Sequence, residues 1–545
     1  MILQAGARCR RAHTVAIQFL LVLLLACGLY GSKGPFVAGH YAYHAGEYAT
    51  RARHTLRHHA VLPSNMPGYN EPTLDTYYLH HPILTHQIAT VSLLLFGPQE
   101  LAIRAAALFS TVLAFWLLSS IVRRYYGLWQ SVFAAAVFVL VPIHIWFAAH
   151  MDPGMPGIAC VLGFLFCYLR WVETAHLRWG LTAITLFVLS ALFEWSPYLA
   201  GLPVGLHALY LAIRRRGRFL LWPVLFLLSA ALPLLLHYII VVKTGHLAEM
   251  RLSYLSRSGG PGFRAVLPRL WTAARLLFGD PLLLLMLSWP VLLLRRQPSA
   301  RALLPIACAT AWVGYMVLLP AAVQIHLYRL MYGGVLAALA ATEWADAASA
   351  AVERWLSFWK LRWLVPVAFC LGIVGSTSPL AWRALFESRR LGGQPLYAGY
   401  DPELRPRAFI QRVLSLTTPA DLVYVHDNFM VRKDLFYYLD RKLMNAPSLS
   451  WAVSRPQVER DQAVFILIES GLSAQERDQL SSVAKRHPIW RVPPYALVDL
   501  RRAQRVDEPA IAPSHNETLL PPPARSAWQR YWEGPYAYPQ LGPAK

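Results

Sequence analysis

The sequence is poor in charge, in acidic residues and in cysteine. Only 15% of its residues are charged, whereas soluble domains average about 25%. Its 29 acidic residues are outnumbered by 51 lysines and arginines, which gives a formal net charge of +22. The six cysteines lie in or beside apolar segments and form no CxxC pair. The pattern therefore shows neither a disulfide framework nor a thiolate zinc site.

Long apolar runs make up most of the sequence. The chain is 56% hydrophobic and its mean hydropathy is +0.37, which predicts an integral membrane protein. The basic residues recur in short clusters between the apolar runs. Such clusters are typical of cytoplasmic loops that meet anionic lipid. We therefore expect membrane lipid, and no nucleic acid, as a partner.

The fold class that we predict is mainly α, with about eleven transmembrane helices and a small soluble α/β domain at the C-terminal end. The first run follows three arginines, is long for a signal sequence and lacks a clear cleavage site, so we expect a retained span with a cytoplasmic N-terminus. The predicted spans cover residues 15–31, 100–122, 129–148, 155–171, 179–194, 197–213, 219–241, 279–294, 302–320, 328–345 and 363–380.

The connections between these spans alternate in character. One set is short and basic, as in Arg123-Arg124 and Arg214-Arg215-Arg216, and the other set is acidic, aromatic and rich in histidine. The positive-inside rule places the basic set in the cytoplasm. The second set, with all the candidate chemistry, and the C-terminal domain are then expected on the outer face of an inner (plasma) membrane.

Three regions are predicted along the chain. Residues 1–380 form the membrane domain, with a long outer loop at 32–97, and residues 381–505 form the soluble domain. In the soluble domain, strands are expected at 420–425, 463–468 and 495–500, and helices at 431–442 and 473–486. Residues 506–545 are rich in proline and are expected to be an extended tail.

The outer segments contain two candidate general bases. On a helix, Glu47 shares a face with Thr50, Arg51 and His54; the plainer interpretation is an ordinary Glu47–Arg51 helix pair. Asp152 lies just outside the end of a span, where it would either cap the next helix or take part in chemistry. The two roles of Asp152 are compatible.

Histidines and one arginine are the candidate binding residues. His80 and His81 precede Pro82 at the mouth of a span, either as interfacial polar groups or as contacts to sugar or phosphate. Arg329, which follows His326 and Tyr328, suits phosphate oxygens but also fits an interfacial arginine that meets headgroups. Glu194, beside Trp195, is interpreted as part of an interface anchor.

A metal site could in principle be assembled from histidines and an acid of the outer segments. The candidates are His44, Glu47, His80 and His81. Their spacing matches no clear ligand pattern, so we expect neither a metal nor another cofactor.

Several of these segments together resemble the GT-C superfamily of glycosyltransferases, which use lipid-phosphate sugars. The nearest likeness is to bacterial proteins of the O-mannosyltransferase-like and aminoarabinose-transferase-like kinds. The segments that carry the resemblance are His44 to Arg53 (HAGEYATRAR), Tyr78 to Pro82 (YLHHP), Phe96-Gly97 with Arg104, Met151-Asp152-Pro153, Phe193 to Pro197 (FEWSP) and His326 to Arg329 (HLYR). One position departs from the pattern: the family commonly has an Asp-Glu pair where this chain has Gly46-Glu47.

The resemblance implies an inverting glycosyltransferase that moves a sugar from a polyprenyl-phosphate donor to an acceptor hydroxyl at the outer face. It implies Glu47 or Asp152 as the catalytic carboxylate and a protein, lipid or glycan as the acceptor. The substrate-binding residues would be His44, Arg51, His80, His81, His326, Tyr328 and Arg329. Two alternatives remain: a transporter or flippase of a lipid-linked sugar, which the absence of visible repeats disfavours, and a non-catalytic protein with the same fold.

Overall fold

The computed structural model is mostly helical and divides into two compact units. The first unit comprises Met1–Lys33, Leu79–Ile88 and Arg104–Glu387, and the second comprises Gly34–Tyr78, Ala89–Ile103 and Ser388–Lys545. The structure describes residues 2–31, 40–63, 77–97, 99–215, 220–258, 262–295, 300–325, 327–355, 364–390, 406–418, 421–429, 433–469, 472–493 and 495–502. The predicted tail at 506–545 lies outside these residues.

The first unit consists of helices. In chain order they are α1 (Ile2–Gly31), α5 (Leu128–Leu140), α6 (Pro142–Phe147), α7 (Gly154–Thr174), α8 (Leu177–Phe193), α9 (Ser196–Arg215), α10 (Trp222–Lys243), α11 (Leu247–Ser258), α12 (Gly262–Phe278), α13 (Asp280–Arg295), η3 (Ala300–Ala302), α14 (Leu303–Leu318), α15 (Pro320–Ile325), η4 (Leu327–Leu330), α16 (Met331–Trp355) and α17 (Leu364–Arg390). Two more helices, α3 (Leu84–Phe96) and α4 (Glu100–Tyr125), and the end of α17 contain residues of both units.

The packing of the first unit centres on two helices that are buried along most of their length, α7 and α16. Helix α7 packs against α8, and α16 packs against α5, α13 and α14. Helix α10 instead exposes a large apolar surface that includes Leu227, Leu232 and Tyr238. A helix with an apolar outer face suits lipid, which offers its backbone no hydrogen bonds. The chain is thus a multi-pass membrane protein of mainly α fold, as predicted.

The predicted spans all coincide with apolar helices of the structure. Among the described residues, six helices are long and apolar enough to cross a membrane, or seven if the pair Val266–Phe278 and Asp280–Leu294, bent by 111°, is one span. The remaining spans correspond to shorter apolar helices in α5, α8, α14 and α17. The number of crossings stays a prediction.

Three segments differ from the expected pattern. The span predicted at 129–148 is broken between α5 and α6, because Pro142 lacks an N–H group and begins a new helix. The long loop predicted at 32–97 contains α2 (His40–His58) and α3. The connection at 242–278 contains α11 and α12. In α12 the buried Val266, Leu270 and Leu277 recur at helical spacing among arginines, so that the charges concealed an apolar stripe.

The second unit contains a five-stranded sheet in the order β2-β1-β3-β5-β4. The strands are β1 (Leu422–His426), β2 (Lys442–Ala446), β3 (Ala463–Ile468), β4 (Ile489–Val492) and β5 (Tyr495–Asp499). Strand β1 pairs in parallel with both β2 and β3, whereas β5 is antiparallel to β3 and β4. The three predicted strands are the central ones, β1, β3 and β5.

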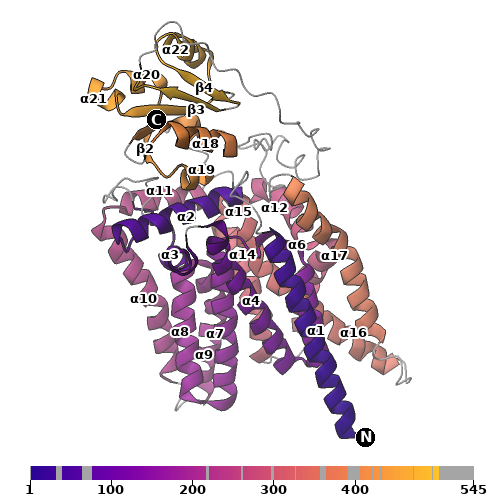
Figure 1. The fold of residues 1–545 in the computed structure, drawn as a ribbon. Helices are drawn as coiled ribbons and strands as arrows, with labels where there is room; N and C mark the ends of the chain where they lie inside the picture. Colours follow the sequence, from indigo (N-terminus) through magenta and orange to yellow (C-terminus); the bar gives the residue numbers. More distant parts are fainter. Residues whose placement is uncertain are drawn as a thin grey trace. The chain divides into compact units, whose positions relative to one another are not determined.

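Helices cover both faces of this sheet (Figure 1). On one face, α18 (Pro406–Leu416) contributes Phe409 and α19 (Lys433–Leu439) contributes Phe436 to the core. On the other face, α20 (Leu449–Val453) contributes Leu449 and α22 (Ala474–Ala484) contributes Leu480. A short α21 (Gln457–Arg460) precedes β3. The predicted small α/β fold of the C-terminal region is confirmed.

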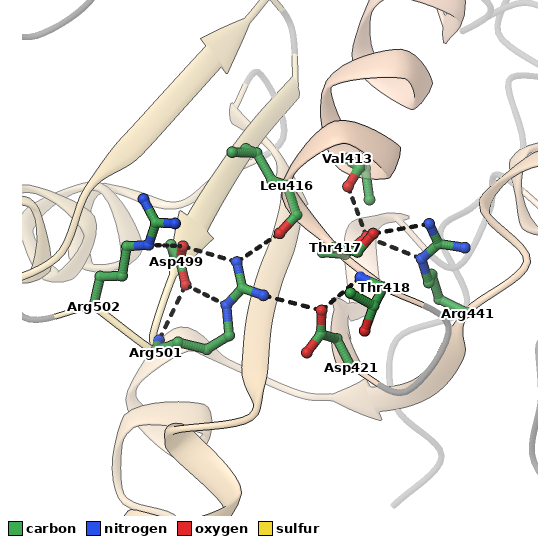
Figure 2. Close-up of polar contacts among 9 residues, drawn as sticks. All are labelled: Val413, Leu416, Thr417, Thr418, Asp421, Arg441, Asp499, Arg501 and Arg502. Atoms are coloured by element: carbon green, nitrogen blue, oxygen red, sulfur yellow. Dashed lines mark hydrogen bonds and ion pairs between the residues drawn. The ribbon is translucent and has the colours of Figure 1, made fainter.

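A single arginine joins the ends of three elements in this domain (Figure 2). Arg501 donates to the carbonyl oxygen of Leu416 at 2.7 Å, at the end of α18, and to Asp421 Oδ2 at 3.0 Å, just before β1. Its Nε also donates to Asp499 Oδ1 at 2.8 Å, at the end of β5. The hydrogen bond to Asp499 raises the pKa of Arg501 above its usual value. Arg501 therefore closes the domain where the described chain ends.

Candidate functional site

Asp152 lies between α6 and α7 and is fully buried. Its Oδ1 accepts a hydrogen bond from the backbone N–H of Gly154, the first residue of α7, so the predicted helix-capping role is present. Its Oδ2 makes no hydrogen bond with the described residues and lies 3.8 Å from His150 Nε2. One carboxylate oxygen is thus fixed by the helix and the other is available for chemistry.

Glu194 and Arg329 form a buried ion pair in the same unit. Glu194 directly follows α8 as its C-terminal cap, and Arg329 belongs to η4. Arg329 Nη1 donates to Glu194 Oε2 at 2.7 Å, and both side chains are only 1% exposed. Ser196 Oγ donates to the same carboxylate oxygen at 3.2 Å. Two residues that are distant in sequence thus neutralise each other inside the first unit.

Arg329 also contacts residues from two further segments. Its Nη2 lies 3.4 Å from both ring nitrogens of His81. Its guanidinium lies 5.3 Å from the centre of the Tyr315 ring, which α14 contributes. The structure therefore brings Arg329 into direct contact with Glu194, His81 and Tyr315, and the charge of Arg329 acts on Asp152 by lowering its pKa against the effect of burial. We define the buried cluster as Asp152, Glu194, Arg329, His81 and Tyr315.

Burial governs the proton equilibria of the two carboxyl groups, which lie outside the helices. Desolvation raises the pKa of Asp152 to about 8, because the hydrogen bond from Gly154 and the charge of Arg329 only partly offset it. Desolvation also raises the pKa of Glu194 to about 7, against the opposing charge of Arg329. Carboxyl groups with a pKa near neutrality can take up and release protons under ordinary conditions.

The second unit holds the other candidate base on α2. Glu47 is buried and accepts a hydrogen bond from Arg51 one turn later, as the sequence predicts. His44 Nδ1 lies 3.7 Å from Glu47 Oε2. The guanidinium of Arg51 stacks on Tyr78, at 3.6 Å from the ring centre. His44, Glu47 and Arg51 thus form one polar group on one helix.

The remaining predicted binding residues are placed differently. His80 bonds to Ser253 Oγ and to Glu249 Oε1 of α11, at 2.8 Å each, whereas its neighbour His81 contacts Arg329. Tyr328 belongs to η4, but its side chain and the whole of His326 lie outside the described residues. In the described part of the chain, no three His, Cys, Asp or Glu residues are grouped so that they could hold a metal ion.

Sequence reasoning missed the role of Glu194. Its position beside Trp195 suggested an interface anchor, whereas the structure buries it against Arg329. A signal was available, because the predicted topology places both residues at span ends on the same side. A lone acid and a lone arginine near the membrane interior each need a partner of opposite charge.

The helical bundle, its buried charged cluster and the small α/β domain define a class of polytopic membrane proteins. Comparison with known proteins specifies that class. A family model described as dolichyl-phosphate-mannose-protein mannosyltransferase matches residues 80–241. This segment contains His81, Asp152 and Glu194, three members of the buried cluster. No curated protein sequence is significantly similar to the chain.

Solved structures of the same fold cover nearly the whole chain. ArnT from Cupriavidus metallidurans, bound to undecaprenyl phosphate, matches with a TM-score of 0.59 and 15% identity over 88% of this chain and 97% of ArnT. Its apo structure matches with a TM-score of 0.57 and 14% identity over 89% and 98%. The oligosaccharyltransferase of Archaeoglobus fulgidus, in complex with Zn and sulfate, matches with a TM-score of 0.51 and 13% identity over 86% and 72%.

These matches confirm the resemblance found in the sequence. The chain has the fold of the GT-C superfamily of glycosyltransferases, to which the family model and the solved structures both point.

Proposed function

We propose that the protein is an inverting glycosyltransferase that moves a sugar from a polyprenyl-phosphate donor to an acceptor hydroxyl. The observation that carries this proposal is the buried cluster in a GT-C fold. An acid, an ion-paired arginine and a histidine converge there from separate segments of the first unit. Buried charged groups are costly inside a membrane protein and usually mark function.

The donor lipid is the part of the proposal that a related structure supports. ArnT binds undecaprenyl phosphate, and this chain has the same fold. Arg329 is the best-placed described residue for the phosphate, because a guanidinium can hold two phosphate oxygens at once. His81, 3.4 Å from that guanidinium, is placed to contact the same group.

Asp152 is the general base that the geometry supports best. Its Oδ2 makes no hydrogen bond among the described residues and can receive the proton of an acceptor hydroxyl. Glu47, the other candidate, is already engaged by Arg51. The family commonly has an Asp-Glu pair where this chain has Gly46-Glu47, which also weakens the case for a catalytic base in this segment. We therefore rank Glu47 second.

The proposed reaction is a single displacement. The acceptor hydroxyl attacks the anomeric carbon on the face opposite the phosphate, and its proton passes to Asp152. The bond from the anomeric carbon to the phosphate oxygen breaks, and the lipid phosphate leaves with an added negative charge. Arg329 stabilises that charge as it develops.

The other substrate contacts remain part of the proposal. They are His44, Arg51, His80, His326 and Tyr328. The acceptor is a protein, lipid or glycan at the outer face, where the soluble domain would help to hold it. No described residue argues for a cofactor.

The experiment that tests this function is transfer by purified full-length protein in detergent, with a panel of polyprenyl-phosphate sugars. We expect transfer from at least one donor, and a product whose anomeric configuration, measured by NMR, is opposite to that of the donor. A product with retained configuration would contradict the single displacement. Saturable donor binding without turnover would favour the transporter or the non-catalytic protein with the same fold instead.

A further inference from the structure

The carboxylate of Glu194 is paired with Arg329, the residue that would bind the donor phosphate in the proposed function. Arg329 Nη1 lies 2.7 Å from Glu194 Oε2, and neither side chain is more than 1% exposed. A carboxylate and a phosphodiester present the same kind of anionic oxygen to a guanidinium. The Glu194 carboxylate is therefore an anion of the protein itself, bound to Arg329 where an anionic ligand would bind.

Helix α7 is shaped to admit this carboxylate. A Cβ atom at Gly157 would lie 2.7 Å from Glu194 Oε1, closer than such atoms come in real structures. Glycine in the first turn of α7 thus lets the carboxylate rest against the helix. On its other side, Ser196 Oγ holds Oε2 at 3.2 Å. The placement of Glu194 is fixed by the fold and is not a chance contact.

The charges around Glu194 do not allow a further anion without compensation. The titratable and charged groups that face it, directly or through its neighbours, come from six segments: Asp152, His150, Arg329, His81, Tyr315, Tyr332 and, through Tyr315, Arg257 of α11. Arg329 is the cation that pairs directly with Glu194, whereas Asp152, with its pKa raised to about 8, is neutral in the resting protein. A second buried anion beside the Arg329 guanidinium would lack a direct counter-charge, which is strongly unfavourable.

We propose that Glu194 is a proton-coupled placeholder: the donor phosphodiester displaces it from Arg329, and Glu194 takes up one proton from solution as the donor binds. The protonated carboxyl no longer competes for the guanidinium and can donate its O–H to a phosphate oxygen. The net charge of the cluster is then the same before and after binding. This inference rests on the proposed function, because it takes Arg329 as the donor-binding residue.

A binding experiment tests this coupling without any sugar transfer. The probe is a polyprenyl methyl phosphodiester, which carries the charge and lipid of the donor but no sugar. A phosphodiester does not titrate near neutral pH, so proton exchange belongs to the protein. Calorimetric titration at pH 8 in buffers of different ionisation enthalpy gives the number of protons taken up. We expect about one per probe for the wild type and about none for Glu194→Gln.

The affinity for the probe should depend on pH, because binding is coupled to proton uptake by Glu194. In the wild type, the affinity should fall about tenfold per pH unit above the pKa of Glu194. Glu194→Gln should bind the probe more tightly than wild type at pH 8 and with little dependence on pH. The matched control is Glu343→Gln, because Glu343 is also buried but bonds to Tyr126, just after α4, and to Trp289 of α13. This control should retain the wild-type proton uptake.

The outcomes separate this inference from the proposed function. No probe binding, or unchanged binding by Arg329→Gln, would overturn the donor site and the proposed function with it. Binding that needs Arg329 but takes up no proton would overturn the placeholder alone. Proton uptake that survives in Glu194→Gln and disappears in Asp152→Asn would also overturn it, because Asp152 would then be the acceptor. The wild-type measurement decides the coupling even if a variant fails to fold.

Discussion

Burial determines how Asp152 behaves. Its carboxyl group is fully buried, and its pKa is raised to about 8 from an ordinary value of 3.8. The folded protein therefore holds a proton there that the unfolded chain releases. The stability that this proton contributes is complete below pH 3.8 and is lost as the pH rises through about 8. Burial of this carboxyl group therefore costs folding stability at high pH, and it leaves a base that is neutral in the resting protein.

The pH dependence of transfer follows from this shift. As a general base, Asp152 must be ionised, so the logarithm of kcat, measured at saturating donor, should rise with a slope of about one and level off. The levelling should occur near the pKa of Asp152, about 8. Steady-state rates from pH 5.5 to 9.5 measure the profile, with a donor that does not titrate in this range. A flat wild-type profile would argue against Asp152 as the base.

At this scale the sequence identified single residues but not their pairing. Asp152 and Arg329 stood out because charge is rare in an apolar chain, and the structure buries both in the first unit, where the charge of Arg329 acts on Asp152. Their common neighbour Glu194 did not stand out, because the pairing joins positions 135 residues apart. Local patterns such as Glu47 and Arg51, one helical turn apart, were predictable.

At the scale of elements, the C-terminal domain is closed by Arg501, which joins α18, β1 and β5 (Figure 2). Arg501→Ala would leave Asp499, which is fully buried, without its main partner. We expect the free energy of unfolding of this domain to fall by about 3 kcal/mol. Thermal unfolding of the full-length protein, followed by limited proteolysis, measures this loss.

Arg502 offers a matched control for that variant. It also approaches Asp499, at 3.6 Å, but its side chain is 66% exposed. Arg502→Ala should change the unfolding free energy by no more than about 0.5 kcal/mol. Equal losses in the two variants would show that Arg501 has no special role in closing the domain.

Asp440 of the C-terminal domain is one of the groups that hold helix α2 within the second unit, where α2 packs against α19. Arg53 and Arg57, one turn apart on α2, both form ion pairs with Asp440 Oδ1 at 3.1 Å, and Arg57 also donates a hydrogen bond to it. Asp440→Asn removes the charge, while asparagine tolerates the positive φ of 39° found there. We expect the last turn of α2 to loosen, with hydrogen exchange of its amides faster by about tenfold. The control is Asp461→Asn, whose described side-chain partner is the neutral Gln457. Unchanged exchange in Asp440→Asn would contradict this anchoring role.

The elements that could be predicted are those with a strong apolar pattern. Strands β3 and β5 are buried almost throughout, so their sequences are continuous apolar runs. Strands β2 and β4 lie at the edges of the sheet and carry polar residues such as Lys442 and Arg491, which hid them. Helix α12 was hidden in the same way by its arginines.

At the scale of the whole molecule, the apolar helices fix the class of protein and the basic connections predict its orientation. We expect the N-terminus in the cytoplasm and the C-terminal domain in the periplasm. Alkaline phosphatase fused after Arg502 should then be active, and green fluorescent protein fused there should stay dark. The reverse result would contradict the predicted topology and place the C-terminal domain on the side of the basic connections.

The central claim is that the buried cluster performs sugar transfer, with Asp152 as its base. The most direct measurement compares transfer rates of the wild type, Asp152→Asn and Glu47→Gln, with Glu343→Gln as a control for loss of a buried carboxylate. We predict that Asp152→Asn lowers kcat by about 10²- to 10³-fold, while the control keeps the wild-type rate. Transfer that survives Asp152→Asn but disappears in Glu47→Gln would move the chemistry to α2. Transfer that survives both changes would contradict the account.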